Sequence, residues 1–416
     1  MADLLHVFHG QRQAGDLRRR ADGQMTFVYA GTWLDDESGF PISGSLPLSP
    51  AVNADPAAHA FFANLLPEGA LREAVARQLG ISVSNDFALL EAVGGECAGA
   101  LSLLPEGQTP DGASAGYEPL STGVVADMAR RFSVLPEASG RRPRLSLAGA
   151  QDKLPVRRDD DGSLWLPTGG APSTHILKVP SRDFRHLPAN EVLSTRLARE
   201  AGLATTDIEM VSLEEVAVAV VRRYDRKVEG SHITRLHQED LCQALGLMPG
   251  MKYEREGGPG FVDAMRVVRE RSIDPLIDAR QLLLWQSFNL LAGNADGHGK
   301  NLSVLRTAAG ERLAPFYDLV CTRAYPDIDR SLAMTVGGAA DPGQIGRRHW
   351  EGLAGQVDVG VRLVLRQLEQ LALALPEALE RVAEEHVDQH GGSPIIERIR
   401  RVIRRQCRRT LRLLGS

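Results

Sequence analysis

Cysteines are few in this sequence and lie far apart. The 416 residues contain only Cys97, Cys242, Cys321 and Cys407, and no two of them form a CxxC pair. Structural zinc sites and disulfide frameworks need closely or regularly spaced cysteines, so the spacing argues against both. A chain of this kind is expected in a reducing, cytoplasmic environment.

Long apolar runs, a leader segment and a strong net charge are also missing. No apolar run reaches the roughly 18 residues of a membrane-spanning helix, and the first residues lack the basic segment and apolar core of a signal peptide. The net charge of −5 gives the chain no general attraction to nucleic acid or anionic membrane. We therefore expect a cytoplasmic protein without a membrane partner.

Sequence patterns divide the chain into four parts. Residues 1–105 predict an α+β subdomain, and the Pro- and Gly-rich start of 106–142 predicts a linker and lead-in. Strand-like runs dominate 143–237, with one helix at 189–201, and helices dominate 238–416. This layout predicts an α+β, bilobal protein-kinase-like fold with a β-rich N-lobe and a helical C-lobe, preceded by the N-terminal subdomain. Nucleotide would lie between the lobes.

Several single elements can be placed more closely. Residues Met25–Tyr29 and Val216–Arg222 are predicted strands. Residues 155–158 and 164–166 flank an Asp-Asp-Asp-Gly turn, which predicts a β-hairpin. The apolar run 282–291 predicts a buried helix.

The stretch 294–301, Asn-Ala-Asp-Gly-His-Gly-Lys-Asn, has the spacing of a phosphoryl-transfer loop. In such a loop an Asp accepts the proton of the acceptor hydroxyl, and an Asn five residues later holds a metal ion. Asp296 and Asn301 have this spacing, Lys300 would lie near the transferring phosphate, and Asp318 would be a second Mg²⁺ ligand. The alternative is a capped turn, because Asn, Asp and Gly favour turns.

Lys178 lies in the strand-like run Thr-His-Ile-Leu-Lys-Val-Pro. A lysine among apolar neighbours is costly unless its charge is paired. Triphosphate oxygens and Glu191, on the following helix, would supply the pairing. The alternative is an edge-strand lysine whose ammonium reaches solvent. His298 has an ordinary alternative too, which is to brace the loop backbone.

The stretch 146–153, Ser-Leu-Ala-Gly-Ala-Gln-Asp-Lys, precedes the first hairpin strand. Its small residues would let backbone N–H groups approach phosphates, although a plain turn fits as well. The predicted nucleotide-binding residues are Ala148, Gly149, Ala150, Gln151, Lys153, Lys178, Glu191 and His298.

Three charged stretches are ambiguous. Residues 222–226, Arg-Arg-Tyr-Asp-Arg, are either a kinase hinge or a solvated charge run, and 236–240 either face the cleft or begin a helix. Residues 395–414 carry eight arginines beside an apolar stripe. Such a helix binds nucleic acid, acidic partners or membrane, or else packs on its own domain.

Taken together, these motifs resemble the HipA family of bacterial serine/threonine-protein kinase toxins. The matching segments lie in the same order over nearly the full chain: Asn-Leu-Leu-Pro-Glu-Gly at 64–69, Gly-Ala-Leu-Ser-Leu-Leu-Pro at 99–105, the 146–153 stretch, His-Ile-Leu-Lys-Val-Pro at 175–180, Asn-Glu at 190–191, Arg-Leu-His-Gln-Glu-Asp-Leu-Cys-Gln-Ala-Leu-Gly at 235–246, Lys-Tyr-Glu at 252–254, Gly-Gly-Pro-Gly at 257–260, the 294–301 loop and Phe-Tyr-Asp at 316–318. Two features differ from the family pattern: the arginine-rich tail, and glycine at 297 and 299, where alanine is familiar.

The resemblance implies an activity, cofactors and partners. It implies transfer of the ATP γ-phosphate, with Mg²⁺, to a protein serine, with an aminoacyl-tRNA synthetase of the glutamyl type favoured as target, and growth arrest or persistence as the result. It also implies self-inactivation by autophosphorylation at Ser146. The implied partner is a helix-turn-helix antitoxin, through which alone DNA is bound. In the same correspondence Asp296 falls on the catalytic Asp, Asn301 and Asp318 on the Mg²⁺ ligands, and Lys178 on the ATP lysine.

Two other functions remain open on sequence alone. Small-molecule phosphotransferases of the aminoglycoside-kinase type use the same Asp and Asn spacing. A binding module that acts as co-repressor with a DNA-binding antitoxin would not need the chemistry.

Overall fold

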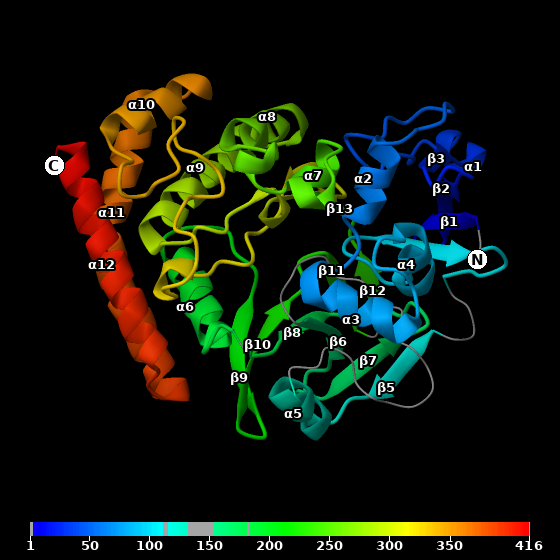
Figure 1. Ribbon diagram of the computed structural model, residues 1–416, viewed down its shortest axis with the longest axis horizontal. Coiled ribbons are helices and arrows are strands. Elements are labelled where there is room, and N and C mark those ends of the chain that lie inside the picture. The colour runs from blue at the N-terminus through cyan, green and yellow to red at the C-terminus, as the bar shows by residue number, and fades with distance from the viewer. Residues whose placement is uncertain (1–2, 111–114, 132–152, 181–182, 231, 416) are drawn as a thin grey trace.

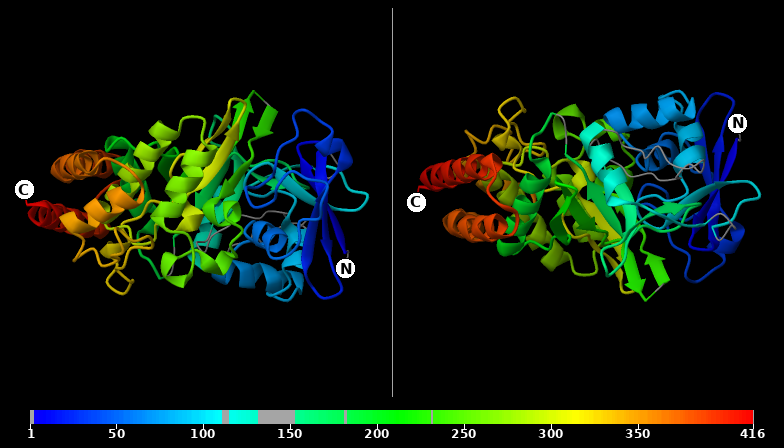
Figure 2. Two further views of the ribbon diagram at one scale, coloured as in Figure 1. Left: turned by 90° about the horizontal axis from the view of Figure 1, so that it is seen from above. Right: turned by 90° about the horizontal axis from the view of Figure 1, so that it is seen from below.

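The computed structural model describes residues 3–110, 115–131, 153–180, 183–230 and 232–415. The N-terminal domain and helix α12 (Pro394–Leu414) lie at opposite ends of the long axis (Figures 1 and 2). The N-terminal domain contacts both the β-rich lobe and the helical lobe. The predicted α+β, bilobal kinase-like class is confirmed.

An antiparallel sheet and a layer of short helices form the N-terminal domain. The strand order is β3-β2-β1-β4, and alternating side chains of β1, such as Leu5 and Val7, are fully buried. The elements are β1 (Leu4–His9), β2 (Arg12–Arg19), β3 (Met25–Tyr29), β4 (Leu101–Pro105), α1 (Gly31–Leu34), α2 (Ala57–Ala63), α3 (Gly69–Leu79) and α4 (Asp86–Val93).

The β-rich lobe contains an antiparallel sheet of order β5-β7-β6-β8-β10-β9. Helix α6 packs on β9 and β10 and ends before Gly202, whose φ of +90° reverses the chain. The elements are β5 (Gly116–Pro119), α5 (Thr122–Arg131), β6 (Lys153–Arg158), β7 (Leu164–Thr168), β8 (His175–Lys178), α6 (Leu187–Glu200), β9 (Ile208–Leu213) and β10 (Val216–Arg222).

The prediction of a linker over 106–142 is wrong for two of its described segments. Strand β5 pairs with β7 at the edge of the sheet, and α5 packs on β9 and β10. Both segments therefore belong to the β-rich lobe. Its sheet begins before residue 143 because β5 is held by pairing with a strand about 50 residues later in the chain.

The helical lobe is built around α9 (Pro275–Ala292), which is buried along most of its length. The lobe also contains a small sheet of order β13-β14-β15, which the sequence did not predict. A separate hairpin, β11 (Arg226–Glu229) and β12 (His232–Arg235), precedes it. The other elements are β13 (Gln238–Asp240), α7 (Leu241–Ala244), α8 (Phe261–Arg271), β14 (Ser303–Thr307), β15 (Gly310–Leu313), α10 (Arg347–Gln356) and α11 (Val361–His390), with short 3-10 turns at Pro249–Met251, Glu254–Glu256, Gly299–Asn301 and Thr322–Ala324.

Helix α12 packs on its own lobe, which is the more ordinary of its two predicted roles. Its apolar side chains face α11 and α9, and Ile395, Ile399, Ile403 and Cys407 are each 1% exposed. In the described part of the chain, no helix is both long enough and apolar enough to cross a membrane.

A buried ion cluster joins the N-terminal domain to the segment that connects the two lobes. The Glu96 carboxylate accepts hydrogen bonds from Arg223 (3.1 Å) and Arg226 (2.5 Å), and Arg223 also donates to Asp225 (2.7 Å). All four side chains are buried. The alternative of a solvated charge run at 222–226 is therefore wrong for three of its five residues.

Candidate active site

The loop 294–301 begins where α9 ends. Gly293 ends the helix with a φ of +73°, and an added Cβ would lie 2.6 Å from Val402, so this position requires glycine. The side-chain oxygen of Asn294 then accepts a hydrogen bond from the backbone N–H of Asp296 (3.1 Å). The backbone carbonyl of His298 accepts one from the backbone N–H of Asn301 (2.9 Å). The loop is thus a capped turn in its local geometry, and this turn exposes the Asp296 side chain.

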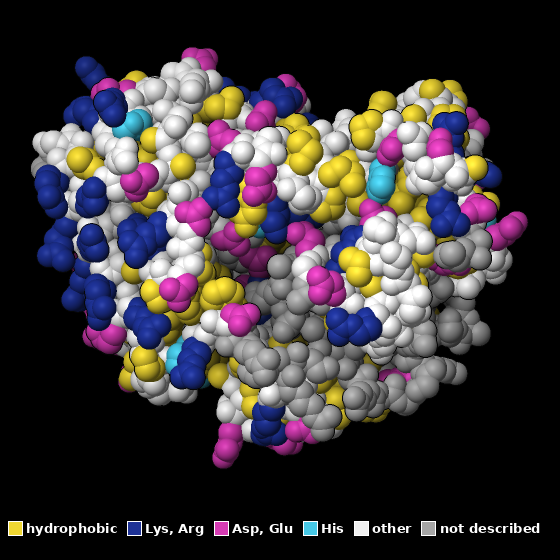
Figure 3. Space-filling model, in the orientation of Figure 1, with side chains coloured by type: hydrophobic (Ala, Val, Ile, Leu, Met, Phe, Trp, Pro, Cys, Tyr) yellow, Lys and Arg dark blue, Asp and Glu magenta, His cyan; other side chains and the backbone are white. Residues whose placement is uncertain are grey.

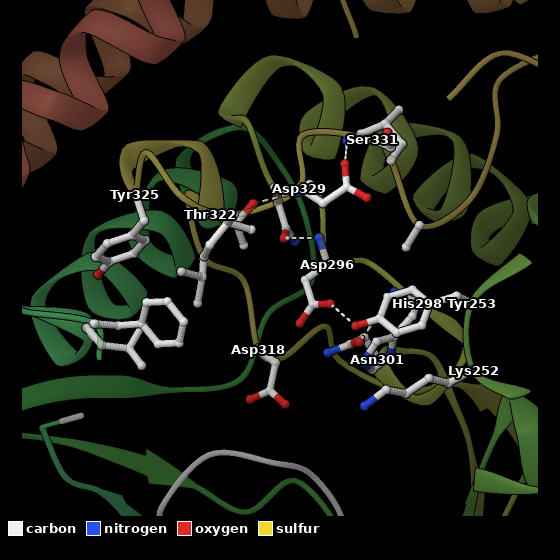
Figure 4. A pocket seen from close by; sticks show the side chains of 18 of the residues that line it. Lys252, Tyr253, Asp296, His298, Asn301, Asp318, Thr322, Tyr325, Asp329 and Ser331 are labelled. Atoms are coloured by element: carbon white, nitrogen blue, oxygen red, sulfur yellow. Dashed lines mark hydrogen bonds between the residues drawn. The ribbon is translucent and has the colours of Figure 1, made fainter. Parts of the chain in front are cut away.

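Tyr253 holds the Asp296 carboxylate. Its hydroxyl donates to Asp296 Oδ1 at 2.6 Å, and its ring packs edge-on against His298 with ring centroids 5.2 Å apart. Figure 4 shows both side chains beside the same cavity. No described side chain donates a hydrogen bond to the second carboxylate oxygen, Oδ2, which could accept one from an acceptor hydroxyl.

Lys178 lies at the centre of a buried charge cluster. Strand β8 lies between β6 and β10, so the alternative of an edge-strand lysine is wrong. The Lys178 ammonium pairs with both Glu191, on α6, and Asp318, and its side chain is 4% exposed. Burial opposes the charge, but the two carboxylates outweigh it and raise the pKa of Lys178. The lysine is therefore charged, and it links α6 to the loop that carries Asp318.

Asp318 has a strained backbone. Its φ is +53°, in the left-handed region that non-glycine residues rarely occupy. Burial disfavours its charge, but Lys178 and Lys153 outweigh this and lower its pKa. This backbone conformation turns the Asp318 carboxylate toward Lys178 and Lys153.

Two cavities meet at this cluster. The larger, of about 490 Å³, contains Asp296 and Tyr253, and the smaller, of about 120 Å³, contains Lys178. Lys153, His298, Asn301 and Asp318 line both cavities. The site therefore has a side with the carboxylate of Asp296, a side with the lysine–glutamate pair, and a shared region between them.

The shared region carries titratable groups with displaced pKa values. Burial lowers the pKa of Lys153 to about 8. The positive charge of Lys178 also lowers this pKa, whereas the negative charge of Asp318 raises it. Burial also lowers the pKa of His298, so this imidazole is neutral at pH 7, and its Nδ1 has no hydrogen-bond partner among the described residues. An anion in this region could accept a hydrogen bond from His298 Nδ1 in the tautomer that carries its proton there.

The donor set of the shared region suits a hard cation only in part. Asn301 and Asp318 offer amide and carboxylate oxygens, which Mg²⁺ prefers. Among the residues that the structure describes, no cluster of three His, Cys, Asp or Glu side chains could hold a metal ion. A Mg²⁺ ion there would complete its coordination with water and phosphate oxygens, as is usual for this ion.

Lys300 lines the smaller cavity, and its place near the transferring phosphate remains a prediction. Its ammonium donates to Asn64 Oδ1 (2.6 Å) and Asp240 Oδ2 (3.0 Å) and lies 3.5 Å from Glu68 Oε1. Asn64 and Glu68 belong to the N-terminal domain. Because these partners already satisfy the ammonium, the contacts favour a role in holding the loop against that domain.

Five predicted residues lie outside the described part of the chain: Ser146, Ala148, Gly149, Ala150 and Gln151. Their roles remain predictions.

The sequence prediction missed three aromatic or amide side chains of the site. Tyr253, Asn190 and Tyr317 belong to the Lys-Tyr-Glu, Asn-Glu and Phe-Tyr-Asp motifs of the family resemblance, but none of them was predicted to be a site residue. Asn190 exchanges hydrogen bonds with the Cys321 backbone (2.9 and 3.0 Å) and so fixes the segment after Asp318. Tyr317 stacks on Tyr224 in the smaller cavity, with centroids 5.7 Å apart. Only their places next to charged motif residues could have indicated them.

The lobes and the charge clusters between them define the class of protein. A strand lysine paired with a helix carboxylate, opposite an Asp–Asn loop and a further Asp, is the arrangement of a protein-kinase-like phosphotransferase. The chain belongs to the HipA family: residues 145–389 match the HipA-like C-terminal domain and residues 5–104 match the HipA N-terminal domain.

Known proteins agree with this assignment. The serine/threonine-protein kinase toxin HipA of Shewanella oneidensis is 31% identical, over 91% of this chain and 89% of that protein. Y4mE of Sinorhizobium fredii, whose name assigns it provisionally to the kinases, is 40% identical over 92% and 93%. The solved complex of HipA, HipB and operator DNA from Shewanella oneidensis MR-1 contains a chain with a TM-score of 0.85 and 27% identity, covering 99% of this chain and 98% of that one.

Proposed function

We propose that the protein is an ATP-dependent serine/threonine protein kinase toxin that phosphorylates a protein target. The observation that carries this proposal is the meeting of two cavities at Lys153, His298, Asn301 and Asp318. The smaller cavity, of about 120 Å³, is below the roughly 300 Å³ of a typical ligand pocket, so it cannot hold a whole nucleotide. A nucleotide bound there would therefore extend its phosphates into the shared region. The γ-phosphate would then face Asp296.

The residues supply orientation and charge to the transfer. Lys178, released from Asp318 by the nucleotide, would bind phosphate oxygens while Glu191 keeps its place. The acceptor serine hydroxyl would donate its proton to Asp296 Oδ2 as its oxygen forms a bond to the γ-phosphorus and the bond to the β-phosphate oxygen breaks. Mg²⁺, held by Asn301 and Asp318, would offset the charge of the phosphates.

The remaining parts of the proposal come from the family. We infer that the target is an aminoacyl-tRNA synthetase, that the result is inhibited translation and growth arrest, and that autophosphorylation of Ser146 is self-inactivating. We also infer an antitoxin partner, supported by the related complex with HipB and operator DNA.

Labelled ATP and Mg²⁺ test the reaction. The purified chain, freed of phosphate beforehand, should label itself on serine and should label one enriched protein in a cell lysate. Asp296→Asn should abolish both signals, and Glu37→Gln, an exposed control in the N-terminal domain, should leave both intact. Label on an added aminoglycoside, with no labelled protein, would instead establish a small-molecule phosphotransferase. Operator repression that survives in the Asp296→Asn variant would show that a co-repressor role does not need the chemistry.

A further inference from the structure

The outward face of α12 is a row of arginines on an otherwise acidic chain. The helix carries eight arginines and only one acidic residue, Glu397, whereas the whole chain has a net charge of −5. The exposed members are Arg398, Arg401, Arg404, Arg405, Arg408 and Arg412. Figure 3 shows them as a column of positive side chains along the edge of the molecule over α12.

Half of these arginines have their charges balanced or their donors used by the protein itself, and half do not. Arg400 and Arg404 pair with Glu380 (2.9 and 2.8 Å), Arg408 donates to the Arg404 carbonyl (3.2 Å), and Arg409 donates to the Gly343 carbonyl. Among the described residues, no side-chain hydrogen bond or ion pair is made by Arg398, Arg401, Arg405 or Arg412.

Other cations add to the same potential. Burial lowers the pKa of Arg323, and the positive charges of Arg330 and Arg405 lower it further. Arg347, which donates to the Leu414 carbonyl at 3.1 Å, lies at the end of the helix. The face is therefore mainly positive, interrupted by Glu380 and Glu397, and a potential of this sign attracts polyanions.

The chemistry of the face selects the kind of polyanion. A membrane-surface helix buries its apolar side chains in lipid, but the apolar side of α12 is already packed on α11 and α9. Protein interfaces have an apolar, charge-depleted centre, whereas the large exposed apolar residue described on α12 is Leu413, at its end. Regularly placed guanidinium groups without apolar neighbours suit rows of phosphates.

We propose that this face binds the backbone of double-helical DNA, without sequence selectivity and without help from a second protein. From Arg398 to Arg412 the helix advances roughly 21 Å at ~1.5 Å per residue, or about six base pairs at ~3.4 Å each. Because α12 lies beside α11 at one end of the molecule (Figures 1 and 2), its arginine face can meet the phosphates that border the roughly 12 Å wide major groove of B-DNA. The major groove of duplex RNA is deeper and narrower, so its phosphate rows are spaced differently.

Fluorescence anisotropy with the purified full chain and a labelled 24-base-pair DNA duplex tests the proposal. We expect a Kd on the order of 10⁻⁵ M and a steep loss of affinity with salt. Replacing Arg398, Arg401, Arg405 and Arg412 together by glutamine should weaken binding at least about tenfold and flatten the slope of log K against log salt by about three to four, because each phosphate contact contributes ~0.9. These four are chosen because they make no side-chain hydrogen bond or ion pair with described residues, so folding should be retained.

A matched variant removes the same charge elsewhere, replacing Arg18, Arg20, Arg77 and Arg130 by glutamine. It should bind DNA as the wild type does, within about twofold, and both variants should keep the wild-type Tm and self-labelling activity. The proposal is overturned if the two variants lose affinity equally, if the α12 variant binds unchanged, or if duplex RNA or polyglutamate of equal charge binds as tightly as DNA. Loss of kinase activity in the wild type would contradict only the proposed function.

Discussion

Among the single residues of the site, Tyr253 has the most direct control over the predicted base. It occupies one oxygen of Asp296 at 2.6 Å and leaves the other free. A carboxylate without this contact can rotate, because Asp296 is exposed and no other side-chain bond to its carboxylate is present in the described residues. We infer that Tyr253 is a positioning residue, which acts on the reaction through Asp296.

Tyr253→Phe should therefore lower kcat for protein phosphorylation by roughly 10- to 100-fold, because a hydrogen bond to a charged group contributes about 1.5–3 kcal/mol. The KM for ATP should change less than twofold, since the nucleotide side of the cleft is untouched. Steady-state kinetics at varied ATP measures both quantities. Tyr117→Phe removes a comparable hydroxyl, which donates to the Pro172 carbonyl at 2.9 Å, and should leave kcat unchanged. A faster Tyr253→Phe enzyme would mean that the hydroxyl blocks the acceptor position.

On the scale of elements, the 294–301 loop is fixed by close packing against a neighbouring turn. An added Cβ at Gly299 would lie 2.4 Å from Pro259 Cγ and 3.0 Å from Cys242 Sγ. The chain therefore cannot accept at this position the alanine that is familiar in the family unless the 257–260 turn shifts. The absence of a side chain at Gly299 leaves the space that the Pro259 ring occupies.

Gly299→Ala should destabilise the protein by about 1–3 kcal/mol, the usual cost of overpacking, and should reduce kcat because Asn301 moves with the loop. Adding Pro259→Ala should restore part of both losses, which a double-mutant cycle in urea and in kinase assays would measure. Gly355→Ala, on α10 with nothing within 4 Å of the new Cβ, serves as the control and should not destabilise. Equal losses in the single and double variants would show that Pro259 is not the obstacle.

Elements with a strong local pattern could be predicted from the sequence, and those that depend on distant partners could not. Strand β10 was predicted with its observed bounds because its apolar, β-branched run has few alternatives. Strand β5, Gly-Tyr-Glu-Pro, has no such pattern and exists through pairing with β7. Its segment was therefore predicted as a linker.

The same limit applies to the site. The spacing of Asp296 and Asn301 is local and could be found in the sequence. The direction of the Lys300 ammonium could not, because its acceptor Asn64 is 236 positions away. The hydrogen bond from Tyr253 to Asp296 likewise spans 43 positions. Chemistry encoded by spacing was predictable, whereas the contacts that hold it in place were not.

For the whole molecule, one buried acid contributes to the position of the N-terminal domain. Glu96 is fully buried and pairs with both Arg223 and Arg226, which continue the chain from β10 toward the helical lobe. Burial raises the pKa of Glu96, but the two arginines outweigh it and hold the pKa below its ordinary value of 4.5. The charged form is therefore favoured in the folded state, and it ties the domain to the segment between the lobes.

Glu96→Gln should destabilise the protein by about 3–5 kcal/mol, because the two buried guanidinium groups would keep only Asp225 as a counter-charge. Since the folded-state pKa is lowered, the contribution of Glu96 is present above about pH 4.5 and is lost as the pH falls through the lower, folded-state pKa. The wild-type Tm should therefore fall more steeply below pH 4.5 than the Tm of the variant. Differential scanning calorimetry from pH 3 to 8 measures both effects, with the exposed Glu37→Gln as control. A variant that unfolds within 1 °C of the wild type at pH 7 would show that the domain is held mainly by other contacts, such as those of Lys300 with Asn64.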